Sequence, residues 1–509
     1  MPIFPQGGGF LIKNVASHKD YQAFVKEYLS VLFLARGQLP VLLLYQDVFA
    51  KLWLTDLSPA ISHLVGLYAT SGRPARDPVA LFRSLLLMRV LKVDSMDVWV
   101  KQMRSFPLWA ILSGFPPDDV PGVGTFYDFC SRLWPGSSPH VNLKVRRPRK
   151  KPKKGKKGQK APVQRPGVVD RLVTHFLAKP DVVSGPYDAL HLLFKDTFVM
   201  PSAQLGLLGD TGALSVAGDG TSIRTGGGRY GKSLCDCRKR GVFRCDCPKR
   251  FSDADASWGW DSYREEYFYG RSLYIFTAAD SPHDLPVYLN LFYAQRHDSA
   301  CFVPAWMDLV RLYPEFTFSR CLLDSAHDAV AIYRLLRLHG VEPFIDLNKR
   351  SEGNVSFKDD ISLNPDGIPV CSVGHIMAYG GPCYGRMRHK WRCPKSRKSW
   401  GVVCDRNCSP KAYGRVFYTY EKDNIRLFTR VPRNSPAWKA IYKCRTGVER
   451  TNKRLKCDYH LEQKKRRSTR DWSLEVLLTA SCLHMDAWAQ AASLDVEALL
   501  LGWAGDLAA

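Results

Sequence analysis

The feature that most constrains the fold is an alternation of strand-like and helix-like segments between about residues 168 and 350. The strand-like segments are rich in aromatic and β-branched residues, or are short apolar runs, and both patterns are typical of strands. The expected strands are 214–219, 267–278, 285–294, 318–324 and 341–346, and the expected helices are 303–312 and 326–338. This alternation predicts an α/β domain in which helices cover a sheet.

The segments on either side of this alternation differ in composition, and we expect six regions. Helical periodicity before residue 140 predicts an all-helical N-terminal domain. Lys144–Lys160 contains 11 basic residues and no acidic one, which predicts a disordered linker, either a solvated tether or an arm that binds phosphates. The expected regions are the helical domain 1–140, the linker 141–167, the core 168–350, a Cys-rich insertion with strands 351–431, the rest of the core 432–470, and a C-terminal helical segment 471–509.

The charge balance indicates a polyanionic partner. Lys and Arg number 73 against 48 Asp and Glu, and the formal net charge is +25. Such an excess favours nucleic acid over an acidic membrane surface. Because no apolar run approaches the roughly 18 residues of a membrane span, and no secretory signal is visible, we expect a cytoplasmic, nucleoid-associated protein with no membrane partner.

One segment near the C-terminus combines a carboxylate with cations. On an ideal helix at about 100° per residue, with Tyr442 at zero, Arg445 falls near about 300°, Lys456 near about 320° and Glu449 near about 340°. A single acid within a cationic stripe suits a metal site beside a phosphate backbone. The alternative is an ordinary surface helix in which Arg445 and Glu449 form a weak ion pair.

Two aspartates are expected at the ends of strands. Asp219 closes the run Leu214-Ser-Val-Ala-Gly-Asp, and Asp324 follows Phe318-Ser-Arg-Cys-Leu-Leu. Active sites of open α/β sheets lie at the carboxyl ends of strands, and carboxylates are the ligands that Mg²⁺ prefers. Taken singly, Asp219 could belong to a turn and Asp324 could cap a helix. His327 and Asp328 could also reach a metal, although helix capping is the more ordinary role for Asp328.

The spacing Tyr-x2-Arg-x3-Glu-x6-Lys, filled by Tyr442, Arg445, Glu449 and Lys456, resembles the signature of the IS4-like DDE transposases of bacterial insertion sequences. The resemblance implies an RNase H-like catalytic core interrupted by a large insertion, and an N-terminal helical domain that binds DNA. It also implies that Tyr442, Arg445 and Lys456 hold DNA phosphates near the cut end. A further implication is that a Trp in the insertion stabilises a flipped base, for which the candidates are Trp391, Trp400 and Trp438.

The same resemblance implies the catalytic group and the reaction. Asp219, Asp324 and Glu449 would be the catalytic carboxylates and would bind two Mg²⁺ or Mn²⁺ ions. The protein would act as a homodimer or larger assembly on double-stranded DNA, cleave at terminal inverted repeats and join the 3′ ends to target DNA. The alternatives are a non-catalytic DNA-binding protein descended from a transposase and a structure-specific metal-dependent nuclease with the same core.

Cysteine spacing suggests structural metal. Cys235, Cys237, Cys245 and Cys247 form two Cys-x-Cys pairs that could bind Zn²⁺ or remain thiols. A second set that could bind zinc consists of Cys371, Cys383, Cys393, Cys404 and Cys408, with His375 nearby. Gly226–Ser233 matches the pattern GxxxxGKS, but because no helix start follows it, we expect a loop and not a nucleotide site. A short basic cluster lies at 464–467.

Overall fold

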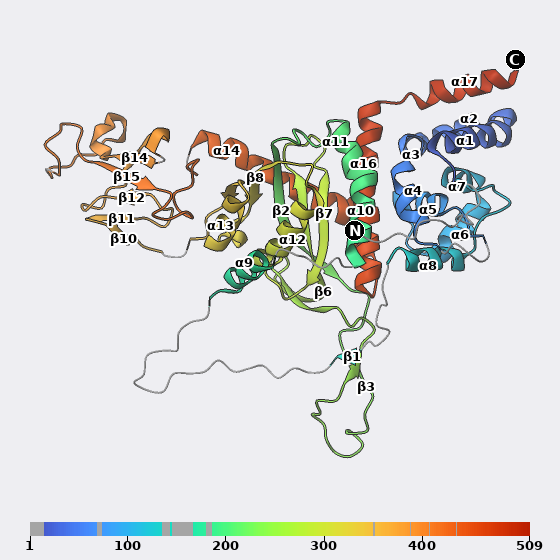
Figure 1. The fold of residues 1–509 in the computed structure, drawn as a ribbon, viewed down its shortest axis with the longest axis horizontal. Coiled ribbons are helices and arrows are strands. Elements are labelled where there is room, and N and C mark those ends of the chain that lie inside the picture. Colours follow the sequence, from blue (N-terminus) through green and yellow to red (C-terminus); the bar gives the residue numbers. More distant parts are fainter. Residues whose placement is uncertain are drawn as a thin grey trace.

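The computed structural model places an N-terminal group of helices at one end of the molecule, a mixed sheet in the middle and a smaller β region at the other end (Figure 1). The described residues are 15–68, 74–134, 143–144, 166–179, 186–349, 352–386, 388–406, 408–433 and 435–508. The predicted linker therefore lies outside the described residues, except for β1 (Leu143–Lys144) and residues 166–167. None of the described helices has the combination of length and apolar character needed to cross a membrane.

All regular elements in the described part of 15–134 are helices, as predicted. The longer ones are α1 (His18–Leu32), α3 (Gln46–Leu54), α5 (Pro78–Val90), α6 (Met96–Ser105), α7 (Pro107–Ser113) and α8 (Val123–Arg132). α5 is buried along nearly its whole length, and Asp77 caps it by accepting hydrogen bonds from Val79 N and Ala80 N. α6 and α7 are separate helices, because Pro107 begins a new helix.

The central sheet has the order β5-β6-β2-β8-β9, and β7 also pairs with β6. Its strands are β2 (Leu214–Arg224), β5 (Ser257–Asp261), β6 (Glu266–Ala278), β7 (Pro286–Tyr293), β8 (Phe318–Leu323) and β9 (Glu342–Ile345). β2 runs antiparallel to β6 and parallel to β8, and β8 runs parallel to β9. The aromatic and β-branched runs at 267–278 and 285–294 are therefore strands, as predicted.

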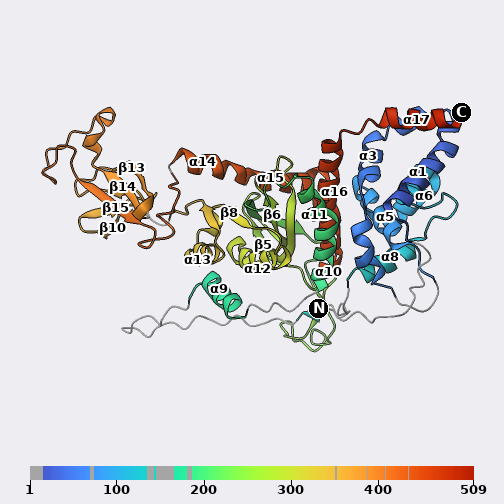
Figure 2. The same cartoon turned by 45° about the horizontal axis from the view of Figure 1, so that its top comes forward.

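Helices lie on both faces of this sheet, as the alternation predicted. Figure 2 shows α12 (Asp298–Leu312) and α13 (Val330–Leu338) on one side, and α14 (Pro436–Tyr442) and α15 (Thr446–Lys453) on the other. The long helix α16 (Thr469–Ala492) packs against α3 and α5 of the N-terminal group and also against β7 and α10 (Pro186–Phe194). α16 is apolar on all sides because it lies between two groups of elements.

A buried ion cluster joins the N-terminal helices to α16. The Glu475 carboxylate is 2% exposed and pairs with Arg89 Nε at 2.9 Å and with Arg466 at 2.7 Å. Lys464, also 2% exposed, pairs with Asp94 of the N-terminal domain. Of the basic cluster at 464–467, Lys464 is thus neutralised inside the protein, and the partly exposed Arg466 is paired with Glu475.

The region between β9 and α14 consists of two three-stranded sheets with a small apolar core of their own. The strands are β10 (Val355–Lys358), β11 (Ile361–Leu363), β12 (Pro369–Val370), β13 (Ala378–Cys383), β14 (Arg388–Arg392) and β15 (Val416–Tyr420). The buried residues of this core are Ile361, Met377, Trp391 and Phe417. The insertion contains strands, as predicted, whereas the apolar segment 425–429 near its end forms turns.

Candidate active site

Strand register brings Asp219 and Asp324 side by side. β2 and β8 are parallel, with Ala217 opposite Leu322, so the residues two positions further on are Asp219 and Asp324. Neighbouring strands lie about 4.8 Å apart, and side chains two positions apart share a face. Asp324 follows the end of β8, as predicted. Asp219 does not end its strand as expected, since β2 continues to Arg224 by pairing with the long strand β6.

A third aspartate, which the sequence did not single out, packs against this pair. Asp298 is the first residue of α12, and a Cβ atom on Gly220 would lie only 2.0 Å from its Oδ1. Glycine at 220 therefore lets the Asp298 carboxylate approach β2 directly beside Asp219. Burial, together with the neighbouring carboxylates of Asp298 and Asp324, raises the pKa of Asp219 to about 7.

Asp324 is held by its own turn. Its Oδ1 accepts a hydrogen bond from Ala326 N at 3.1 Å and lies 2.6 Å from His327 Nδ1. His327 is fully buried, and its Nε2 lies 2.8 Å from the Tyr274 hydroxyl, so the ring is held between Asp324 and Tyr274. Burial alone would raise the pKa of Asp324, but the hydrogen bond and charge of His327, together with Arg445, lower it below the ordinary value.

The Glu449 helix contacts the aspartates through a second residue that the sequence reading missed. Asn452 lies one turn beyond Glu449 on α15 and donates from Nδ2 to Asp219 Oδ2 at 2.9 Å. Asn452 Oδ1 is buried without a hydrogen-bond partner among the described residues. The side chain of Glu449 is 51% exposed and pairs with Arg445. Within the described chain, the carboxylates of Asp219, Asp324 and Glu449 do not all lie within 4.8 Å of one another.

The predicted continuous helix over 442–456 is helical throughout but is not ideal. A 3₁₀ turn, Lys443–Arg445, separates α14 from α15, and a π-helix, Arg454–Asp458, follows α15. These changes of pitch alter the angles expected for a regular helix. α15 is fixed over the sheet by Arg450, which pairs with Asp284 at 2.6 Å, and by Thr451, which donates to the Asp284 carbonyl at 2.7 Å.

Two protein-family models match the chain. The family described as "Transposase DDE domain" matches residues 212–485, which is more than half of the chain and includes the three predicted carboxylates. The chain is a member of the DDE transposase family. The family described as "Transposase domain (DUF772)" matches residues 49–132, within the N-terminal helices. Among curated proteins no match was found.

In this DDE transposase, the other two residues of the predicted signature are partly committed to protein contacts. Tyr442 stacks on Trp438, with ring centroids 4.3 Å apart, and donates its hydroxyl proton to Leu323 O at 3.1 Å, immediately before Asp324. Burial lowers the pKa of Lys456 below its ordinary value, although the charges of Glu462 and Asp261 oppose that shift. Membership of the family implies a DNA substrate, and the charges of both Arg445 and Lys456 act on Asp219.

Residues close to the site in sequence have structural roles. Asp328 is 4% exposed, pairs with Arg426 at 2.6 Å and accepts from Asn348 N at 2.8 Å, which fastens the β region to the core. The short 3₁₀ helix Ser325–His327 begins at Asp324, whose side chain caps it, and ends at Asp328, whose backbone N–H donates to Ser325 O. Of the three candidate Trp residues, Trp391 and Trp438 are each 7% exposed and Trp400 is 43% exposed.

Of the two predicted cysteine sets, one converges in the structure and the other does not. The ligand atoms of Cys235, Cys237, Cys245 and Cys247 all lie within 4.8 Å of one another, so this cluster could hold a metal ion. The set consisting of Cys371, Cys383, Cys393, Cys404, Cys408 and His375 forms no such group in the described chain, and the second predicted zinc site is therefore wrong. The GxxxxGKS segment leads into β3 (Lys232–Ser233) and not into a helix, as expected for a loop that does not bind nucleotide.

Proposed function

We propose that this DDE transposase cleaves DNA at the terminal inverted repeats of its own insertion sequence and joins the resulting 3′ ends to target DNA. The observation that carries the proposal is the register of β2 and β8, which sets Asp219 beside Asp324, together with the hydrogen bond from Asn452 of the Glu449 helix. The sheet order and the mixture of parallel and antiparallel pairs support an RNase H-like core. The signature over 442–456 supports assignment to the IS4-like group.

The proposed catalytic residues are Asp219, Asp324 and Glu449, and their surroundings fit divalent metal ions. Asp219 is buried beside other carboxylates and its pKa is raised, which indicates that the nearby cations do not fully compensate the negative charge of these carboxylates. Asn452 Oδ1 adds a buried oxygen that lacks a partner among the described residues. Hard oxygen ligands of this kind suit Mg²⁺ or Mn²⁺. When bound, two such ions would stabilise the attacking and leaving oxygens of phosphoryl transfer.

The cations beside the carboxylates would position the DNA. Arg445 pairs with Glu449 and lowers the pKa of Asp219 and Asp324, so in this structure its charge partly neutralises all three acids. A DNA phosphate would compete for that guanidinium, which would leave Glu449 available to a metal ion. Lys456 would hold a phosphate on the Asp219 side, and Tyr442 would do so after its hydroxyl leaves Leu323 O. A homodimer would hold the two element ends together.

The experiment uses the full chain, a duplex that carries the inverted repeat flanking this reading frame, and a plasmid target in Mg²⁺. We expect cleavage at the repeat boundary and joined product from the wild-type protein. Asp219→Asn, Asp324→Asn or Glu449→Gln should lower cleavage at least ~1000-fold, about 4 kcal/mol of barrier, while binding persists. Asp97→Asn, in the first turn of α6, is the matched control because Asp97 is exposed and remote.

Three other outcomes would contradict this proposal. Cleavage that survives in any of the three variants would remove that residue from the catalytic group. Cleavage without joined product would make the protein a nuclease. Binding by the wild-type protein with neither cleavage nor joining would make it a non-catalytic DNA-binding protein.

A further inference from the structure

An arm, residues 226–252, projects from the central sheet between β2 and β5 and brings four thiols together (Figure 1). The sulfurs of Cys235 and Cys245 are 3.6 Å apart, and those of Cys237 and Cys247 are 3.7 Å apart. A disulfide requires sulfurs about 2.05 Å apart, so these are separate thiols. Four sulfurs at about 2.3 Å from a tetrahedral Zn²⁺ would be about 3.8 Å from one another. The two observed distances are close to this value, and all four sulfurs lie within 4.8 Å of one another, as a zinc tetrathiolate requires.

The arm has little else to hold its shape. Its two strands, β3 and β4 (Lys249–Arg250), are two residues long, and its large apolar side chains face solvent, with Phe243 78% exposed and Tyr230 76% exposed. A segment that buries so little apolar surface does not repay the conformational entropy of ordering. A bound metal ion supplies that stabilisation in small domains of this kind.

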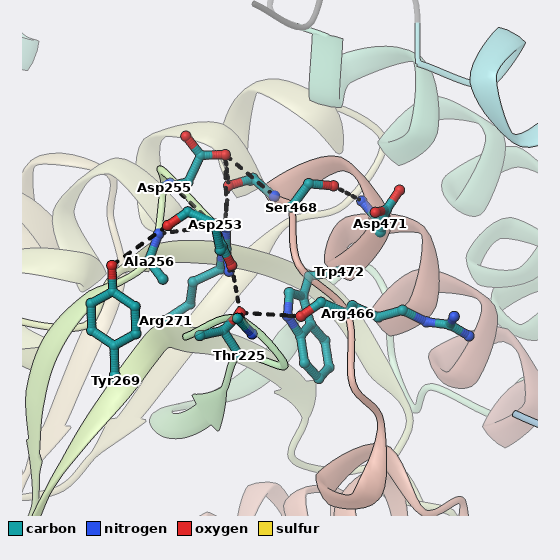
Figure 3. Close-up of polar contacts among 12 residues, drawn as sticks. Thr225, Asp253, Asp255, Ala256, Tyr269, Arg271, Arg466, Ser468, Asp471 and Trp472 are labelled. Atoms are coloured by element: carbon teal, nitrogen blue, oxygen red, sulfur yellow. Dashed lines mark hydrogen bonds and ion pairs between the residues drawn. The ribbon is translucent and has the colours of Figure 1, made fainter. Parts of the chain in front are cut away.

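The base of the arm is fixed to the core at both ends. Asp253 accepts two hydrogen bonds from Arg271, at 2.7 and 2.8 Å, and both side chains are almost fully buried. Thr225, at the other end, donates to Asp253 at 2.6 Å and to Arg466 O at 3.1 Å, as Figure 3 shows. The base therefore has one orientation relative to β2, which carries Asp219 five residues before Arg224, roughly 17 Å away along the strand.

The exposed side chains of the arm are mainly cationic. The arm contains eight exposed cationic residues and two acidic residues, Asp236 and Asp246. The cations are Arg229, Lys232, Arg238, Lys239, Arg240, Arg244, Lys249 and Arg250. Within the part of the chain that is described, Lys239 is the one among the eight that forms an ion pair, with Asp236 at 3.4 Å. β1 pairs with β4, with Lys144 opposite Lys249 in the register. Unlike the buried side chain of Lys464, the eight cationic side chains face solvent.

We propose that Cys235, Cys237, Cys245 and Cys247 bind one structural Zn²⁺, and that the zinc-bound arm binds the phosphate backbone of double-stranded DNA beside the active site. Zinc binding replaces the four thiol protons, which pass to solvent. The excess of unpaired cations at the end of the strand that bears Asp219 is complementary to a phosphate backbone. The DNA-binding half of this inference rests on the proposed function, whereas the zinc half does not.

The first test measures zinc in the full-length protein, purified without chelator. We expect one zinc per chain, and none in the variant with Cys235→Ser, Cys237→Ser, Cys245→Ser and Cys247→Ser. The matched control, Cys404→Ser with Cys408→Ser, should keep the metal, because these cysteines belong to the set that does not converge. Wild-type protein without zinc, or an unchanged zinc content in the quadruple variant, would overturn the assignment.

The second test measures the affinity for a duplex of unrelated sequence as salt is varied. Replacing Arg238, Arg240 and Arg244 by Ala should weaken binding and reduce the slope of log affinity against log salt by about 2 to 3, at about 0.9 per phosphate contact. Replacing the same three by Lys should preserve the slope, because charge is kept. If the wild-type protein binds no DNA, the proposed function fails. If it binds and the Ala variant keeps the slope, this inference alone fails.

Discussion

The carboxylate site and the cysteine arm both gather like-charged groups, but they are stabilised in different ways. The site draws Asp219, Asp324 and Asp298 from two strands and a helix of the core, where burial and neighbouring charge raise the pKa of Asp219. The arm draws its thiols and cations from one short exposed segment. The site is therefore positioned by the whole fold, whereas the arm depends on its base and on the proposed metal. Substitutions in the carboxylate site should therefore lower DNA cleavage, whereas substitutions in the arm should lower zinc content or DNA affinity.

The largest stability effect is expected where the arm joins the core. Arg271→Ala would leave the Asp253 carboxylate buried without its bidentate partner, which costs about 3–5 kcal/mol. Urea unfolding of the full chain measures this loss. Zinc content should not change, because the thiols are local to the arm. The matched control is Arg224→Ala, which breaks a solvent-exposed pair with Glu266 and should cost about 1 kcal/mol or less. Equal losses in the two variants would contradict a stabilised base.

The next effect concerns the aspartate that the sequence did not reveal. Asp298→Asn keeps the shape that packs against Gly220 but removes a negative charge beside Asp219. We expect cleavage to fall roughly 10- to 100-fold, about 1.4 to 2.7 kcal/mol of barrier, with zinc content and DNA affinity preserved. Single-turnover cleavage measures the change, with Asp97→Asn as the remote control. An unchanged cleavage rate would show that Asp298 only packs against the strand.

A smaller effect is the pH dependence of folding in Mg²⁺-free buffer. The folded pKa of Asp219 is raised to about 7, so the folded state retains a proton that the unfolded chain loses near pH 4. The stability contributed by this group is full below pH 4 and is lost as the pH rises through 7. Melting temperature should therefore fall between pH 5.5 and 8, and less so in Asp219→Asn.

Chelators must be absent from that experiment, because they would also remove zinc from the arm. Added Mg²⁺ should stabilise the wild-type protein more at pH 8 than at pH 6, since the ion takes the place of the lost proton. A pH dependence identical in wild type and Asp219→Asn would assign the titration to another group.

Sequence predicted the parts that depend on local pattern. The aromatic strands β6 and β7 and the apolar helix α16 were recognisable from composition and periodicity. The cluster of Cys235 to Cys247 was recognisable because its spacing is short. The second zinc site, predicted from Cys371 to Cys408, was wrong, because longer spacings do not determine whether side chains converge. Asp324 was recognisable because an apolar strand ends at Leu323.

The parts that depend on tertiary contacts were not recognisable. Gly220-Thr-Ser reads as a turn, but β6 is long enough to keep that segment in β2. Nothing near Asp298 or Asn452 marks them as neighbours of Asp219, because the contacts arise from the packing of α12 and α15. Likewise, the basic cluster at 464–467 gave no sign that Lys464 would be buried and paired with Asp94 of the N-terminal domain.

The central claim is that Asp219 contacts a catalytic metal ion, and replacing its carboxylate with a thiolate tests this most directly. Mn²⁺ accepts a sulfur ligand more readily than Mg²⁺, which prefers oxygen. Cleavage of inverted-repeat DNA by Asp219→Cys should therefore be lost in Mg²⁺ and partly restored in Mn²⁺, whereas the wild-type protein is active in both. If Asp219→Cys cleaves DNA at the same rate in Mg²⁺ and in Mn²⁺, whether that rate is high or low, the claim is contradicted.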